Sequence, residues 1–171
     1  MPYMPYFGIL NLEDAGFIKT YSSYSGTISS IANTYDGSTA TYGTQTSQSA
    51  SIVFTYTGTC PTTLYAYITT CSSLWDIYAE SDFGDSSTFG NYTGTVFNLQ
   101  WHSSTNGTSW TYEGGLSNQS PGTKALNFSG ALSPYIRITI WFSYIFDEPG
   151  WLELGGAFLS GTMRVNEVLY E

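Results

Sequence analysis

Strict alternation of apolar and polar residues is the feature that most limits what this chain can fold into. Apolar residues recur at every second position in five runs: SIVFTY at 51–56, LYAYI at 64–68, VFNLQW at 96–101, YIRITIWF at 135–142 and TMRVNEVLY at 162–170. Side chains of a β-strand point alternately to its two faces. The runs therefore predict strands with one buried face.

Clusters of turn-forming residues separate these runs: DGST, SDFGDSSTFGN, SSTNGTS, EGGLSNQSPGTK, SGALSP and DEPGW. No window has a helical stripe, and residues 32–35 and 17–21 have room for a short helical turn at most. Many short strands separated by turns predict an all-β fold, an antiparallel β-sandwich or jelly roll. At 171 residues we expect one domain over 13–171, preceded by an extended arm over 1–12 that contains two Pro-Tyr pairs.

Charge excludes several classes of partner. Only 10% of residues are charged, the net charge is -9, and four residues are cationic. Nucleic acids and anionic lipids both select for Lys and Arg, so we expect neither as a partner. No apolar run is long enough for membrane insertion, and the first residues lack a signal-peptide pattern. We expect a chain that stays in the cell, leaves by another route, or leaves inside an assembled particle; the alternative is a processed mature chain with an added Met.

Cys60 and Cys71 are the two cysteines, and they flank a strand-like run. They either form a disulfide, if the chain folds back between them, or remain two buried thiols. The sequence leaves both alternatives open.

Four segments, in order, resemble the discoidin or coagulation factor C-domain family. They are IANTYDGSTATYGTQ with ASIVFTY, then FNLQWHSSTNGTSWT, then PYIRITIWF, and finally MRVNEVLYE. The resemblance implies a galactose-binding-like jelly roll, a fold that many carbohydrate-binding modules share. The sequence departs from the family at Tyr42, where Trp is usual, and in the long segments 60–94 and 142–161.

The resemblance also implies a structural calcium site. The matching positions are Asp36, Thr41, carbonyls near Asn33 and Ser38, and Glu167. These are the hard oxygen donors that calcium prefers. Glu167 follows the two-residue register of the last run, so we expect its carboxylate on the apolar side, held by calcium, Arg137 or Arg164. The alternative is an ordinary hairpin turn at Asp36-Gly37.

Carbohydrate contacts require aromatic platforms beside polar side chains. We expect such platforms at Trp75, Trp151 and Tyr112, which lie in or beside predicted loops, with His102 and Asn106 as polar partners. The alternative for Trp101, Trp110 and Trp141 is packing in the core or on a sheet face.

Glycosylation sequons occur at Asn91, Asn106, Asn118 and Asn127, all at predicted turns or strand edges. Enzyme motifs are lacking: His102 has no obvious catalytic partner, and the paired carboxylates are typical of turns. We therefore expect no enzymatic activity.

Two functions fit this sequence. The first is an adhesive structural protein on the surface of an assembled particle, most of all a virion, which contacts other subunits or forms a homo-oligomer. The alternative is a carbohydrate-binding module at an extracellular surface, whose partner is a cell-surface glycan.

Overall fold

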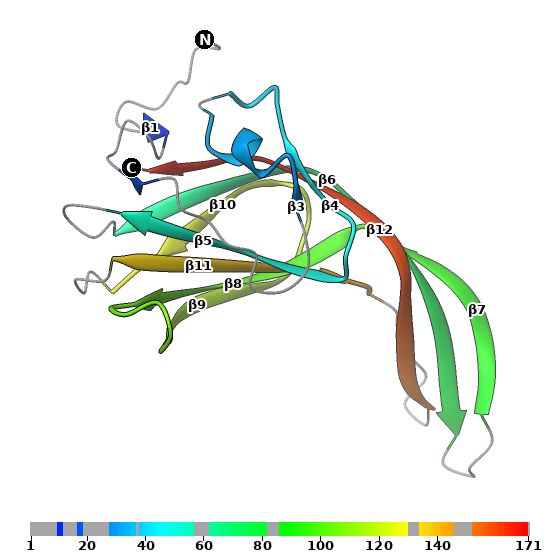
Figure 1. Ribbon diagram of the computed structural model, residues 1–171. Helices are drawn as coiled ribbons and strands as arrows, with labels where there is room; N and C mark the ends of the chain where they lie inside the picture. Colours follow the sequence, from blue (N-terminus) through cyan, green and yellow to red (C-terminus); the bar gives the residue numbers. More distant parts are fainter. Residues whose placement is uncertain are drawn as a thin grey trace.

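Two antiparallel β-sheets pack face to face in the computed structural model of the chain (Figure 1). The structure describes residues 10–11, 17–18, 28–36, 38–56, 62–81, 86–129, 134–145 and 152–170, and the side chains of 28–36, 38–55, 62–78, 90–129, 134–145 and 155–168. Its elements are β1 (Leu10–Asn11), β2 (Phe17–Ile18), β3 (Ile28–Ser29), the 3-10 helix η1 (Ile31–Thr34), β4 (Gly43–Gln45), β5 (Ser49–Tyr56), β6 (Thr63–Ser81), β7 (Ser86–Gly94), β8 (Val96–Ser104), β9 (Thr111–Gln119), β10 (Gly122–Asn127), β11 (Tyr135–Ser143) and β12 (Leu152–Tyr170). Over these described ranges, no helix is long and apolar enough to cross a membrane.

Seven strands form the larger sheet. Its order is β10-β6-β12-β4-β3, with β1 paired to β12 and β7 paired to β6. The smaller, five-stranded sheet has the order β2-β5-β11-β8-β9. All the pairs are antiparallel. The β-sandwich predicted from the sequence is confirmed.

The five alternating runs all lie in strands, and their apolar residues fill the space between the two sheets. The largest fully buried side chains are Phe54, Phe97, Phe142, Ile52, Leu64, Ile68, Ile77, Leu99, Leu126, Ile136, Ile138 and Ile140. Burial of these faces is the main force that holds the sheets together, at roughly 25 cal/mol per Å² of apolar surface. The short helical turn expected near 32–35 is present as η1.

Some of the predicted turns are wrong. The cluster EGGLSNQSPGTK contributes residues 113–119 to β9 and 122–124 to β10. The end of SDFGDSSTFGN lies in β7, and the second half of the insertion-like loop 142–161 is the beginning of β12. These strands are rich in glycine, which usually weakens a strand. Here several of the glycines make room for aromatic rings of neighbouring strands.

Gly114 in β9 shows this use of glycine. It pairs with Trp101 of β8, and a Cβ built at position 114 would overlap the Trp101 indole. Trp101 is 5% exposed, and its Nε1 donates a 2.7 Å hydrogen bond to the carbonyl of Asn127 at the end of β10. The missing side chain at 114 thus allows one indole to pack against β9 and reach β10.

Three strands continue past the five-stranded sheet as a curved extension, seen at the right of Figure 1. We call it the β-arm: residues 72–81 of β6, all of β7, and residues 152–162 of β12, with β6 in the middle. Aromatic rings pack at its base. Trp75 lies 5.0 Å from Tyr144 and 5.3 Å from Phe158 between ring centroids, and Phe158 stacks on Phe142 at 5.2 Å. Rings from both sheets therefore fix the β-arm to the sandwich.

The N-terminal boundary stays a prediction. Residues 10 and 11, which we assigned to the extended arm, form β1 and pair with Leu169 and Tyr170 of β12. The other residues of the predicted arm lie outside the described ranges.

Substitution Gly114→Ala should destabilise the fold by about 1–3 kcal/mol, because the new methyl group forces the Trp101 indole out of place. Urea unfolding of both proteins measures the difference. In a Trp101→Phe background, whose smaller ring leaves room, the cost should fall. Equal costs in the two backgrounds would show that the glycine does not serve the indole.

Candidate functional site

Two β-bulges face each other where β6 and β12 cross the sandwich. The register between these strands skips Thr69 on β6 and Asn166 on β12. The hydroxyl of Thr69 donates a 2.6 Å hydrogen bond to Oδ1 of Asn166, and Nδ2 of Asn166 donates a 2.9 Å bond to the carbonyl of Thr39. Asn166 therefore ties the loop after η1 to the last strand, the two segments that the family resemblance implied would share an ion.

Glu167 is fully buried, as the sequence predicted. However, the predicted direction of its side chain is wrong. The bulge at Asn166 shifts the alternation, so that Val168 points into the core. Glu167 pairs with Tyr67 and lies on the outer face of the seven-stranded sheet. A bulge reverses the faces of all residues that follow it, and a period-two pattern cannot reveal that.

The Asp-Gly loop places three of the predicted calcium ligands together. Oδ1 of Asp36 accepts a 2.9 Å hydrogen bond from the N–H of Ser38, and its Oδ2 accepts one of 2.6 Å from the Thr41 hydroxyl. The same hydroxyl lies 3.4 Å from the Ser38 carbonyl. Asn33 is used differently, since its Nδ2 donates to the carbonyl of Tyr42 at 3.1 Å.

This donor set fits a calcium ion better than a transition metal. It offers carboxylate, hydroxyl and carbonyl oxygens, and in the described residues no three Asp, Glu, His or Cys side chains gather at metal-binding distance. Arg137 and Arg164 were the alternative partners expected for Glu167. Arg164 stacks on Tyr42 at 4.4 Å, and Arg137 belongs to the opposite sheet.

A second group of polar and aromatic side chains lies on the outer face of the five-stranded sheet. Arg137 of β11 pairs with His102 of β8, which pairs with Tyr112 of β9. The neighbours of Arg137 in β11, Ile136 and Ile138, are fully buried, so this row faces away from the core. With Trp110, which precedes β9, these residues form what we call the β8–β9 surface.

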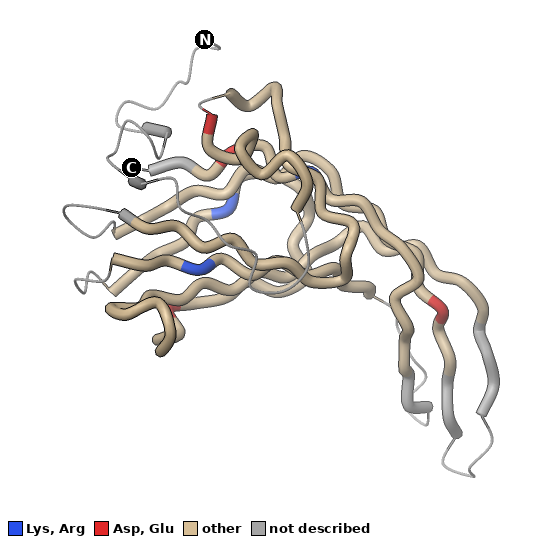
Figure 2. Tube along the Cα trace, viewed as in Figure 1, with Lys and Arg blue, Asp and Glu red and all other residues tan. Residues whose placement is uncertain are grey.

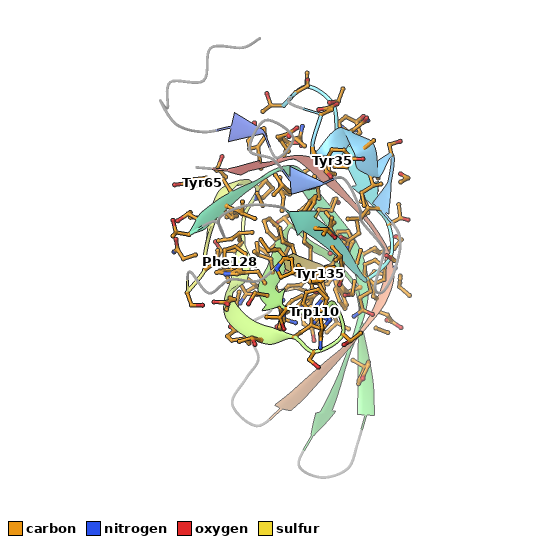
Figure 3. The ribbon with its side chains drawn as sticks, turned by 60° about the vertical axis from the view of Figure 1, so that its left-hand side comes forward. Tyr35, Tyr65, Trp110, Phe128 and Tyr135 are labelled. Carbon is orange, nitrogen blue, oxygen red and sulfur yellow. The ribbon has the colours of Figure 1, made fainter. Side chains whose placement is uncertain are left out.

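Ring contacts organise the β8–β9 surface. The guanidinium of Arg137 lies 4.6 Å from the centre of the Trp110 ring, and the His102 and Tyr112 rings meet edge to face at 5.5 Å. Tyr112 is 61% exposed, the largest fraction among the described large apolar side chains. Figure 3 shows Trp110 in the same region as Tyr135, on the side of the sandwich away from Tyr35 and the Asp-Gly loop.

His102 is neutral in this setting. Its burial and the positive charge of Arg137 both lower the pKa of the imidazole. Nδ1 of His102 and Nε1 of Trp110 are buried with no hydrogen-bond partner among the described residues. Buried polar atoms that the protein leaves unsatisfied are typical of places that take water or a ligand.

The turn between β8 and β9 is held by Asn106. Its Oδ1 accepts hydrogen bonds from the N–H groups of Thr108 and Ser109, at 2.9 and 2.8 Å, and from the Ser104 hydroxyl at 3.1 Å. We predicted Asn106 as a ligand contact, and the structure shows its oxygen engaged in the turn.

Glu113 fixes the strand that carries Tyr112. Oε1 accepts from the hydroxyls of Ser103 and Ser129, at 2.6 and 3.1 Å, and Oε2 accepts from the Ser129 N–H at 2.9 Å. Burial raises the pKa of Glu113, but these three hydrogen bonds outweigh it and lower the pKa below its ordinary value.

The predicted platform Trp75 does not belong to this surface. The loop position predicted for Trp75 is wrong: it lies in β6, is 4% exposed, and donates from Nε1 to the Ser73 hydroxyl at 2.7 Å. A side chain so buried is part of the packing at the base of the β-arm. Trp151 lies outside the described residues.

The predicted modification sites are the two cysteines and the four sequon asparagines. Cys71 is a free thiol in β6, and burial raises its pKa to about 12. Cys60 lies outside the described ranges, and both alternatives for the two cysteines stay predictions. The four sequon asparagines are all exposed: Asn91, Asn106, Asn118 and Asn127.

Arg137, Trp110 and Glu113 were not recognised as members of a site from the sequence. Arg137 lies more than twenty residues from the other two, and only the strand register brings it beside them. The weak signal available was the density of aromatic and hydroxyl residues around the Asn-Gly turn.

No protein-family model matches the sequence, and a search of curated proteins found no relative. Solved structures do match. CBM32 of AlyQ in complex with 4,5-unsaturated mannuronic acid is 14% identical, with 90% of this chain and 95% of that chain covered and a TM-score of 0.51. A mutant of chitosan-binding module 1 from the chitosanase/glucanase of Paenibacillus sp. IK-5 is 14% identical, with 95% of this chain and 98% of that chain covered and a TM-score of 0.51.

A third structure, GH31 CBM32-2 bound to GalNAc, is 13% identical over 91% of this chain and 98% of that chain, with a TM-score of 0.50. At such low identity the likeness shows the fold alone. The fold is the galactose-binding-like jelly roll that the sequence resemblance predicted.

The hydrogen bonds of Glu113 predict a pH dependence. Because the folded state lowers its pKa, Glu113 stabilises the fold above the ordinary value of 4.5, and this stability is lost as the pH falls through the folded pKa. The variant Glu113→Gln should therefore be less stable than the wild type in urea at pH 7, with a smaller difference at about pH 3. An equal difference at both pH values would assign the loss to shape instead of charge.

Proposed function

We propose that this chain is a non-enzymatic glycan-binding module that works at an extracellular surface, with the β8–β9 surface as its sugar contact. The observation that carries the proposal is the exposed Tyr112 ring, flanked on one sheet face by the neutral His102 and by Arg137. The likeness to carbohydrate-binding modules supports it at the level of fold.

The chemistry of the surface suits a sugar. An aromatic ring offers an apolar face to the C–H groups of a pyranose, and adjacent polar groups fix its hydroxyls. Neutral His102 supplies one donor and one acceptor nitrogen, and Arg137 supplies donors only. Stacking on Trp110 and anchoring of β9 through Glu113 hold these groups in place before a ligand arrives, which reduces the entropic cost of binding.

The same residues support binding without catalysis. A glycosidase requires two carboxyl groups on either side of the scissile bond. Glu113 is the carboxylate of this region, and both of its oxygens accept hydrogen bonds from Ser103 and Ser129.

The fold and its likenesses favour the carbohydrate-binding alternative over the virion component that the sequence suggested first. Adhesion through glycans is common to both hypotheses.

Calcium is the second part of this proposal. The ion would be held by Asp36, Ser38 and Thr41 of the Asp-Gly loop. Asn33, close by in sequence, and Glu167, next to the Asn166 contact, would complete the site. When bound, it would cross-link the Asp-Gly loop to β12 and stabilise the fold. The site and the β8–β9 surface belong to opposite sheets, so we expect calcium to act on stability and leave sugar affinity unchanged.

Tyr112→Ala should weaken glycan binding by about tenfold or more, because it removes the exposed ring on which the sugar stacks. A glycan array that includes mannuronate, chitosan and GalNAc ligands identifies the sugar, and calorimetry gives the affinities. Tyr78→Ala, which removes another exposed tyrosine, 44% exposed on the β-arm, is the matched control. Equal binding by wild type and Tyr112→Ala would reject this surface as the site.

Added calcium should raise the melting temperature by about 5–10 °C when its concentration is about a hundred times the dissociation constant. Asp36→Ala should abolish this shift, whereas Asp76→Asn on the β-arm should keep it. If neither calcium nor a chelator changes the melting temperature, the loop is a plain hairpin turn.

A further inference from the structure

One edge of the β-arm is an unpaired strand. From Leu152 to Thr162, β12 pairs with β6 on one side. On its other side, β4 begins to pair at Met163 and β1 pairs with Leu169 and Tyr170. In the parts of the chain that the structure describes, no strand covers this edge over residues 152–162. At about 3.3 Å per residue these eleven residues present about 36 Å of open backbone donors and acceptors.

Apolar groups adjoin this edge. A bulge between Phe158 and Ser160 projects Leu159, which is 51% exposed. Tyr78 of β6 is 44% exposed and pairs with Gly155 of β12, where its ring occupies the space that a Cβ of Gly155 would take. Two of the four exposed large apolar side chains among the described residues thus lie beside this edge. Open strand edges beside exposed apolar residues are sites of association.

The two edges of the β-arm differ. The outer edge belongs to β7, where the exposed residues Asn91 and Thr93 are polar. The β12 edge carries Ala157 and Leu159 at comparable positions, because Ala157 and Asn91 both pair with Asp76. Apolar contact therefore favours the β12 edge.

Charge indicates which partner fits. The chain has a net charge of -9, so two copies repel each other over most of their surfaces. Among the side chains of the β-arm that the structure describes, Asp76 is the single charged one, seen as the red segment of the arm in Figure 2. The sequence of the β-arm also contains Glu80 and Glu153, but residues 154–162 of β12 (LGGAFLSGT) are uncharged. Antiparallel pairing of two copies over this stretch therefore brings no like charges opposite each other.

Strand geometry also suits a second copy. A strand pairs with itself when two copies run antiparallel about a two-fold axis, since each N–H then meets a C=O of the same edge. An axis near Ala157 places Glu153 opposite the uncharged Gly161 of the copy and so keeps the acidic residues apart. The small residues Gly155, Gly156 and Ala157 at the centre permit close approach of the two strands.

We propose that two copies of this chain join through the β12 edges of their β-arms, with residues 152–162 antiparallel across a two-fold axis. The product is a continuous six-stranded sheet in the order β7-β6-β12-β12-β6-β7. The dimer would present two β8–β9 surfaces, and paired weak sites gain avidity on a multivalent glycan. Dimerisation itself does not rest on the proposed sugar binding.

Sedimentation equilibrium of the full chain tests the proposal over a concentration series of about 1 µM to 1 mM. We expect the mass to rise from 18.8 kDa towards twice that value. Hydrogen exchange should show that amides of residues 155–162 become protected in the dimer.

The double variant Ala157→Lys with Leu159→Lys should remain a monomer, because four ammonium groups would face each other across the axis. Asn91→Lys with Thr93→Lys is the matched control. It adds the same charges to the β7 edge, also with one lysine opposite Asp76, and should dimerise as the wild type does. Melting temperatures close to wild type show that both variants fold.

A wild type that stays monomeric throughout the series would overturn the proposal. So would loss of the dimer in the β7-edge variant, or a dimer that survives the β12-edge variant. Tyr112→Ala should still dimerise, so failure of sugar binding and failure of dimerisation are separate results.

Discussion

The pairing of β6 with β12 is the interaction on which the rest of this structure depends. It runs from the pair of Leu64 and Tyr170 to the pair of Ser81 and Leu152, through the sandwich and into the β-arm. Where it crosses the sandwich, its apolar side faces the smaller sheet, and its other side receives the Asp-Gly loop through Asn166. One ladder of backbone hydrogen bonds thus supports the core, the candidate calcium loop and the extension.

Each outer face of the sandwich carries a different kind of chemistry. The seven-stranded sheet is covered near β12 by a loop of oxygen donors and holds a buried carboxylate, Glu167. The five-stranded sheet presents rings and donors, with Tyr112 open to solvent. Separation by a full sandwich means that an ion bound on one face has no direct contact with a sugar bound on the other. The proposed calcium site and the proposed sugar site are therefore expected to act independently of each other.

The sequence was informative wherever one periodic pattern controlled the structure. Alternation in the runs around Ile52, Leu99 and Ile138 identified strands and their buried faces, because burial acts on each second residue. It failed at Glu167, where a one-residue bulge reversed the faces. It also failed in β9, where we interpreted the glycines as turn formers. In the structure, Gly114 of this strand makes room for Trp101. Both failures concern features that exist only once two strands are aligned.

The same limit applied to the candidate site. Tyr112 and His102 were identified because they are close to the Asn-Gly turn. The stacking of Arg137 on Trp110 depends on the order β11-β8-β9, which no local pattern contains. The order of motifs along the chain nonetheless identified the jelly roll correctly, because a resemblance over several segments carries topological information that single motifs lack.

The position of β12 inside the larger sheet also has a kinetic consequence. It lies between β6 and β4, so this sheet cannot close until residues about a hundred positions apart have met. The smaller sheet likewise requires β11 to meet the distant β5, through pairs such as Tyr135 with Thr55 and Trp141 with Ser49. Pairing of such distant segments is slow. Both sheets therefore close only after long-range pairing, and we expect this chain to fold slowly for its length, with apolar strand faces such as that of Leu64, Ala66 and Ile68 uncovered in the meantime.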